Sequence, residues 1–292
     1  MSYKNRGIIY IFPWLLGFVI FTLYPFITSL VLSFTDYKII YQPKFIGFSN
    51  YVNMFNDKIF WTSLFATFKF VILTVPFKLI FALIIAMVLN FKLKGINFYR
   101  TAYYIPSILG GNIAVSILWK LIFQDKGIIN QILNVLGVHS VPWFSNEYAS
   151  LIMLSLLRIW QFGSAMVIFL AALKDIPQEL YEAAWIDGAN KIKAFFYVTM
   201  PLLTPIIFFN LVMQLIQSFQ EFNGPYMITE GGPQYKTYLY SLMIYDNAFK
   251  YFNMGYASAL SWIFFIIIMI FTLLIFKFSK YWVFYSDEGG EN

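Results

Sequence analysis

Six apolar stretches, separated by short polar segments, divide the 292-residue chain. A helix that crosses a bilayer needs about 20 mostly apolar residues, and each stretch is close to that length. The segments between them are rich in Gly, Pro, Asn and charge, as loops are. The pattern predicts an all-α integral membrane protein with six transmembrane helices. The predicted spans are residues 10–34, 64–90, 105–123, 149–173, 202–220 and 256–278.

Composition supports a membrane protein with a single domain. The chain is 60% hydrophobic and 12% charged, whereas a soluble domain carries roughly a quarter charged residues. The loops are too short to hold a separate soluble domain, so we expect one transmembrane permease domain over residues 1–292, with its core at about 60–280. The first span follows the N-terminus without a small-residue cleavage site, so we expect it to remain in the mature protein.

The basic residues indicate orientation more than a nucleic-acid partner. The net charge is +6, but the lysines and arginines are spread along the chain and form no patch that would bind nucleic acid. If the N-terminus lies in the cytoplasm, more of these basic residues fall in cytoplasmic segments than in external ones. The positive-inside rule therefore favours a multi-pass protein with both termini in the cytoplasm.

Catalytic and metal chemistry have few candidate residues. The chain has no cysteine and a single histidine, His139, which argues against a metal site or a Ser-His-Asp set. No segment fits G-x-x-x-x-G-K-[ST], the loop that cradles nucleotide phosphates. We therefore expect no catalytic residue, no metal and no cofactor on this chain.

The segment between the fourth and fifth predicted spans, residues 174–200, is predicted to fold as two short helices. Pro177 suits the first turn of a helix, and Gly188 supplies a break about three turns later. The spacing places Leu180, Asp187 and the two alanines between them on one face, which leaves a shallow surface for another protein. A solvated amphipathic loop helix is the alternative.

This segment also carries a family resemblance. Glu182-Ala183-Ala184, Gly188 and Pro201 resemble the cytoplasmic signature of permease subunits of binding-protein-dependent ATP-binding-cassette (ABC) importers. The resemblance extends over essentially the whole chain. Within the family, the chain is similar to the sugar-transporting branch, which includes the maltose and glycerol-phosphate permeases. The further matches are Pro13-Trp14, Tyr24-Pro25, Gly231-Gly232-Pro233 and Asn253-Met254-Gly255-Tyr256-Ala257-Ser258-Ala259.

The resemblance implies a complete importer in a bacterial cytoplasmic membrane. This chain would pair with a second, distinct permease, two ATPase subunits would carry ATP and magnesium, and an external solute-binding protein would deliver an oligosaccharide. The first of the two short helices would be the coupling helix of the family and would fit a groove of the ATPase. The Glu182 carboxylate could accept two hydrogen bonds from an arginine there. The residues implied in coupling are Glu182, Ala183, Ala184, Asp187 and Gly188.

Polar residues inside the predicted spans are candidates for the substrate path, because such residues usually face a cavity or another helix. One helical face of the fifth span carries amides, a hydroxyl and a carboxylate, which suit sugar hydroxyl groups. Hydrogen bonding between helices is the alternative. The stripe consists of Asn210, Gln214, Gln217, Ser218 and Glu221.

Other spans contain further polar residues. Asn112 and Ser116 follow two glycines in the third span, where packing and substrate passage are both open. Arg158 lies near the middle of the fourth span and needs a partner or a water-filled cavity. It could bind a carboxylate of a uronate-containing sugar, or form a structural pair or cap a carbonyl. Depending on the depth of Lys78 in the membrane, its ammonium group could extend to the polar interface.

Two rival functions use different machinery. A secondary transporter or channel for a small polar solute would need coupling-ion sites or broken helices in corresponding halves, and the sequence shows no such pair of interrupted spans. A membrane enzyme acting on lipid-linked sugars should gather acidic or histidine residues near one membrane face, and we find no such cluster.

Overall fold

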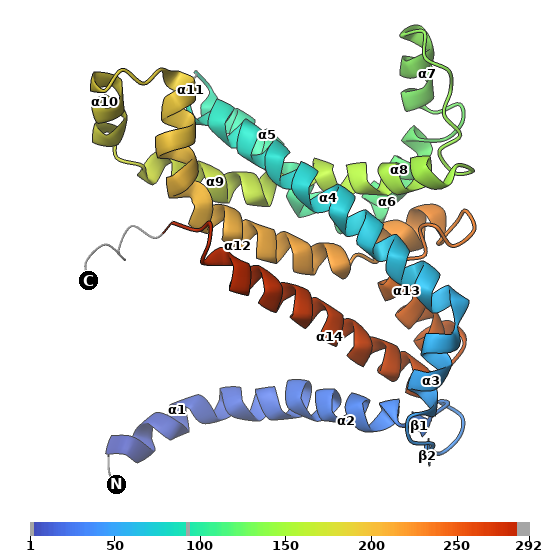
Figure 1. The fold of residues 1–292 in the computed structure, drawn as a ribbon. Helices are drawn as coiled ribbons and strands as arrows, with labels where there is room; N and C mark the ends of the chain where they lie inside the picture. The colour runs from blue at the N-terminus through green and yellow to red at the C-terminus, as the bar shows by residue number, and fades with distance from the viewer. Residues whose placement is uncertain (1–2, 92–93, 285–292) are drawn as a thin grey trace. The chain divides into compact units, whose positions relative to one another are not determined.

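The computed structural model describes residues 3–91 and 94–284, which are almost entirely helical (Figure 1). The chain divides into two compact units, residues 1–61 with 243–267 and residues 62–242 with 268–292, which are described separately below. The boundaries between them fall within α4 (Lys58–Asn90), α13 (Tyr240–Tyr245) and α14 (Met254–Ser279).

The first unit begins with one continuous helical stretch. It consists of α1 (Tyr3–Phe18), a π-helical turn η1 (Val19–Leu23) and α2 (Tyr24–Ser33). Residues 10–33 of this stretch are apolar enough to cross a membrane, which agrees with the first predicted span. The unit also contains β1 (Thr35–Asp36) and β2 (Lys44–Phe45), paired antiparallel, together with α3 (Ser49–Asn56) and η4 (Asp246–Lys250).

Contacts between α2 and the start of α14 hold this unit together. The ring centroids of Trp262 and Phe26 lie 4.6 Å apart, and the Trp262 indole N–H donates to the Ser29 hydroxyl over 3.2 Å. At Gly255 the backbone approaches the Thr35 carbonyl so closely that a Cβ would collide with it. The glycine in the Asn253–Ala259 motif thus lets two backbones meet.

Four helical stretches are each long and apolar enough to cross a membrane. Besides residues 10–33, they are α4, the stretch Lys191–Phe219 and α14. These confirm the first, second, fifth and sixth predicted spans, although α4 extends further toward its N-terminus than residue 64. The Lys191–Phe219 stretch comprises α11 (Lys191–Ala194), η2 (Phe195–Thr199) and α12 (Met200–Phe219).

The third predicted span is a bent pair of helices. α5 (Ile96–Leu109) and α6 (Ile113–Ile122) meet at 101°, where two glycines are followed by Asn112. The Asn112 Oδ1 accepts a hydrogen bond from Ala114 N over 2.9 Å, so this side chain caps α6. Asn112 thus has a local structural role as a helix cap, in addition to the roles considered from the sequence.

The fourth predicted span is also broken. α8 (Glu147–Trp160) and α9 (Gly163–Asp175) meet at 45°. A Cβ at Gly163 would crowd the Tyr103 carbonyl of α5, so the glycine permits α9 to pack against α5. Six spans are reached if each bent pair counts as one. The expectation that no interrupted spans occur is wrong, because a hydropathy window does not register a bend within an apolar stretch.

The second unit contains most of the bundle. α9 packs against both α5 and α12, and α6 packs against η3. Lys236 Nζ lies 2.9 Å from Glu147 Oε2, which ties the segment after η3 to the start of α8. This hydrogen bond raises the pKa of Lys236. The remaining helices of the unit are α7 (Ile128–Val135), α10 (Gln178–Ile186) and η3 (Pro225–Thr229).

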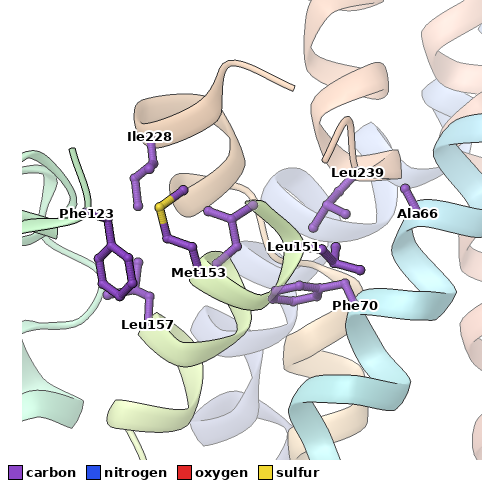
Figure 2. Packing of buried hydrophobic residues seen from close by; sticks show 9 residues of the cluster. Ala66, Phe70, Phe123, Leu151, Met153, Leu157, Ile228 and Leu239 are labelled. Atoms are coloured by element: carbon purple, nitrogen blue, oxygen red, sulfur yellow. The ribbon is translucent and has the colours of Figure 1, made fainter. Parts of the chain in front are cut away.

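A hydrophobic cluster around α8 forms the core of the second unit (Figure 2). Met153 is fully buried, and Leu157 lies one turn further along the same face. Phe70 from α4 and Leu239 belong to the same cluster although they come from distant parts of the chain. Between membrane helices such contacts stabilise mainly through close packing.

Candidate functional site

The short helix α10 exposes apolar side chains although it lies outside the apolar spans. None of its nine residues is buried. Leu180 is 42% exposed, Trp185 51% and Ile186 87%. Exposed apolar side chains gathered on one short helix indicate a protein contact surface.

The end of α10 folds as the sequence predicts. Gly188 adopts a φ of +81°, which L side chains rarely adopt, and the Ala189 N–H donates to the Ala184 carbonyl over 2.9 Å. The Asn190 side chain then caps α11 by accepting from Lys193 N over 2.9 Å. The chain therefore turns sharply between two helices.

A side-chain hydrogen bond joins α10 to the base of the long helix that follows. The Tyr181 hydroxyl lies 2.8 Å from the Thr199 hydroxyl in η2. The helix continues from there through α12 without a break, as far as Phe219. This hydrogen bond therefore connects α10 to a segment that is long and apolar enough to span a membrane.

The residues implied in coupling are gathered on this helix and its C-terminal turn. Glu182, Ala183, Asp187 and Gly188 are exposed, and Ala184 is half-buried. The Glu182 carboxylate accepts one hydrogen bond, from Gln178 Nε2 over 2.9 Å, through Oε1. Its second oxygen has no hydrogen bond within residues 3–91 and 94–284, and so can accept one from a partner.

A second polar site lies inside the bundle of the second unit. Arg158 Nε lies 2.9 Å from Glu221 Oε2, and both side chains are largely buried. The Nε–H does not point at that oxygen, so the contact is an ion pair without a hydrogen bond. Arg158 Nη1 also donates to Gln161 Oε1 over 2.8 Å, and Gln161 Nε2 donates to the Gly110 carbonyl over 3.1 Å. This structural pair was one of the two alternatives for Arg158.

Glu221 also organises the backbone around it. Its Oε1 accepts a hydrogen bond from Gly224 N over 3.0 Å, and its carbonyl accepts one from the Ser241 hydroxyl. The carboxylate therefore binds the Arg158 guanidinium and fixes the turn after α12. Glu221 was placed in the polar stripe from sequence, but its partner could not be read there.

Lys78 adds a second basic side chain to this site. Its side chain is only 3% exposed, and the charges of Arg158 and Glu221 both act on it. In the described part of the chain it has no ion pair. The site thus contains two basic side chains and one carboxylate. The depth of Lys78 could not be read from the sequence, and the structure places it in the interior.

Four of the five stripe residues are buried, three of them in α12 and one just after its end. Asn210 is 1% exposed, Gln214 3%, Ser218 1% and Glu221 7%, whereas Gln217 is exposed. Both amide atoms of Asn210 and the Oε1 of Gln214 have no hydrogen-bond partner within the described residues. Such groups are costly to bury. They are therefore the members of the stripe most in need of a partner.

Metal ligands are not gathered at either site. Among the described residues, no group of three His, Cys, Asp or Glu side chains could hold a metal ion.

The sequence and the fold both match known transport proteins. Residues 7–284 match the family described as "Binding-protein-dependent transport system inner membrane component". The probable ABC transporter permease protein YesP of Bacillus subtilis is 49% identical over 286 residues, which cover 97% of this chain and 93% of YesP. The arabinooligosaccharides transport system permease protein AraP of B. subtilis is 32% identical over 287 residues, covering 96% and 90%.

A solved structure has a similar fold. It is a chain of a bacterial ABC transporter involved in the import of the acidic polysaccharide alginate. The TM-score is 0.79 at 20% identity, and the alignment covers 95% of this chain and 96% of the other.

Proposed function

Since this chain belongs to the family of binding-protein-dependent transport system inner membrane components, we propose that it is the membrane subunit through which ATP hydrolysis drives uptake of an oligosaccharide. It is a component of a transport system and not an enzyme. ATP and magnesium belong to two ATPase subunits at the cytoplasmic face. A second, distinct permease completes the path, and a solute-binding protein delivers the substrate from outside.

The observation that carries the proposal is the exposed apolar surface of α10 together with its link to a span. Trp185 and Ile186 are the side chains available to an ATPase groove. The Tyr181–Thr199 hydrogen bond connects their helix to the long helix that ends in α12. This arrangement suits a lever that moves with the ATPase, with both termini in the cytoplasm.

The carbohydrate substrate is supported by relatives and by the polar stripe. AraP, a permease for arabinooligosaccharides by its description, aligns over nearly the whole chain. The stripe offers amide donors and acceptors, which sugar hydroxyls require. The liganded binding protein and ATP must each bind the two states of the path with different affinities for transport to be coupled to hydrolysis. The outward-facing state would be favoured by the liganded binding protein and ATP, and the inward-facing state would follow hydrolysis.

A pair of matched substitutions tests the docking role of α10. Ile186→Asp places a charge on the proposed contact, whereas Ile40→Asp places one on another exposed isoleucine, in the β1–β2 loop (81% exposed). Ile186→Asp should lower recovery of the ATPase with the purified chain, and substrate-stimulated ATP hydrolysis, by about tenfold or more. Ile40→Asp should leave ATPase recovery unchanged. Equal ATPase recovery from both variants would overturn the docking role.

The substrate can be specified further as an acidic, uronate-containing oligosaccharide. The specific observation is that two basic side chains, Lys78 and Arg158, are buried at a site with one carboxylate, that of Glu221. Burial of a lysine without a counter-ion is costly, and an anionic partner would stabilise its charged form.

Uptake of matched substrates tests this extension. Lys78→Gln should reduce uptake of a uronate-containing oligosaccharide several-fold more than uptake of a neutral one of the same length. Arg158→Gln should do so less selectively, because it also breaks the pair with Glu221. An equal loss for both sugars in Lys78→Gln would contradict the acidic substrate and leave the importer assignment intact.

A further inference from the structure

A cavity of about 500 Å³ lies beside the first turn of α10, within the second unit. Four helices contribute to it: α4 and α9 with their last residues, and α5 and α10 with their first. The lining includes Phe91, Ile96, Arg100, Lys174, Gln178 and Tyr181. Tyr181 is the residue whose hydroxyl links α10 to η2, so whatever fills the cavity contacts the proposed lever.

The charge of this cavity is positive. Arg100 and Lys174 line it, and no lining residue carries a carboxylate. Arg100 uses two of its five N–H donors in long hydrogen bonds, 3.4 Å to Asn97 Oδ1 and 3.3 Å to the Leu89 carbonyl. Its buried Nε has no partner, and Lys174 has no ion pair, among the described residues. The cavity therefore suits an anion.

Two helix N-termini add to this positive character. α5 starts after Gly95 and α10 after Pro177. Neither of these N-cap residues has a side chain that accepts a hydrogen bond from the first N–H groups of its helix. First-turn residues of both helices, Ile96 and Gln178, line the cavity. The first N–H groups of a helix lack intrahelical acceptors and carry partial positive charge. They supplement the two cations of the side chains.

Part of the lining of the cavity is apolar. Phe91 is 67% exposed and directly follows α4, a helix of 33 mostly apolar residues. Leu173 and Ile176 also line the cavity. The end of a long apolar helix is where lipid headgroups meet the protein, and basic side chains there attract anionic lipids. A ligand with a phosphate group and an acyl chain fits both parts of the lining.

We propose that this cavity binds the phosphate group of an anionic phospholipid and that the bound lipid tunes coupling through α10. The guanidinium of Arg100 and the ammonium of Lys174 bind the phosphate oxygens, while Phe91 packs against an acyl chain. The regulatory part of this inference rests on the proposed function of α10. The binding part does not.

The test uses the purified importer complex in nanodiscs of phosphatidylcholine, with or without phosphatidylglycerol. Wild-type complex should retain phosphatidylglycerol in native mass spectrometry, and Arg100→Gln or Lys174→Gln should retain about tenfold less. The matched control is Lys277→Gln, an exposed lysine in the last turn of α14 that does not line the cavity. Equal retention in all variants would overturn the inference. Arg100→Lys, which keeps the charge, should retain an intermediate amount and guards against a folding defect.

A second readout separates the regulatory part from binding. Phosphatidylglycerol should stimulate substrate-dependent ATP hydrolysis in wild-type complex, and this stimulation should be lost in Arg100→Gln while the ATPase still co-purifies. Stimulation that persists in Arg100→Gln would contradict the regulatory part. Stimulation by inorganic phosphate in phosphatidylcholine alone would identify free phosphate as the ligand and overturn the lipid assignment. Loss of ATPase co-purification from the wild type would instead count against the proposed function.

Discussion

At the scale of single residues, Glu221 is the carboxylate on which the buried polar site depends. It pairs with the Arg158 guanidinium, accepts from Gly224 N and lies in the field of Lys78. Removing one partner of a buried ion pair leaves an uncompensated charge, which costs more than the pair itself contributes. The Glu221 carboxylate therefore matters chiefly because its loss would leave the charge of Arg158 buried without a counter-ion.

Neutralising Glu221 should destabilise the protein strongly. Glu221→Gln should lower the free energy of unfolding by about 3 kcal/mol, because Arg158 stays buried without its counter-ion. The control is Glu230→Gln, which breaks an exposed pair with Lys120 at 3.5 Å and should cost about 0–1 kcal/mol. Unfolding of the purified variants in detergent measures both values. Equal losses would contradict the structural role of Glu221.

The sequence could identify these side chains but not their partners. Arg158 had to have a partner because of its depth, and Glu221 belonged to a polar stripe, yet Arg158 lies in α8 and Glu221 just after the end of α12. Periodicity reports which face of one helix a residue occupies and carries no information about the helix opposite. Asn112 also caps α6, and this role could not be predicted because the bend before α6 cannot be seen in hydropathy.

At the scale of elements, the α10–α11 turn was predictable because its signals are local. Pro177 and Gly188 act through backbone geometry alone, and the structure places the helix between them. The breaks at α5–α6 and α8–α9 were not predictable, because they depend on close packing, such as that of Gly163 against α5. The interrupted spans also show that helix breaks alone do not distinguish a secondary transporter from this family.

A substitution at Gly188 tests the turn as an element. Gly188→Val and Gly137→Val each place a β-branched residue at a positive φ, +81° and +76°, with open space around the new Cβ. The local strain should be similar, about 1–2 kcal/mol. Only Gly188→Val should lower substrate-stimulated ATP hydrolysis, by about tenfold, because only Gly188 ends α10. Comparable hydrolysis in the two variants would contradict the lever.

At the scale of the whole molecule, the family membership confirms the resemblance carried by Glu182-Ala183-Ala184, Gly188 and Pro201. Composition alone could give only the membrane class, and the spans could give only a helical bundle. The partners came from the resemblance, because neither composition nor the pattern of spans carries information about them. The proposal assigns this chain three kinds of partner molecule: the ATPase, the second permease and the sugar.

The central claim is that this chain works as one subunit of an ATP-driven importer, and the most direct measurement is purification of the chain from its native membrane in mild detergent, followed by mass spectrometry. We expect an ABC-type ATPase, a second permease and a sugar-binding protein to be recovered with it. Repeated recovery of this chain alone, under conditions that preserve known membrane complexes, would rule out its role as an importer subunit.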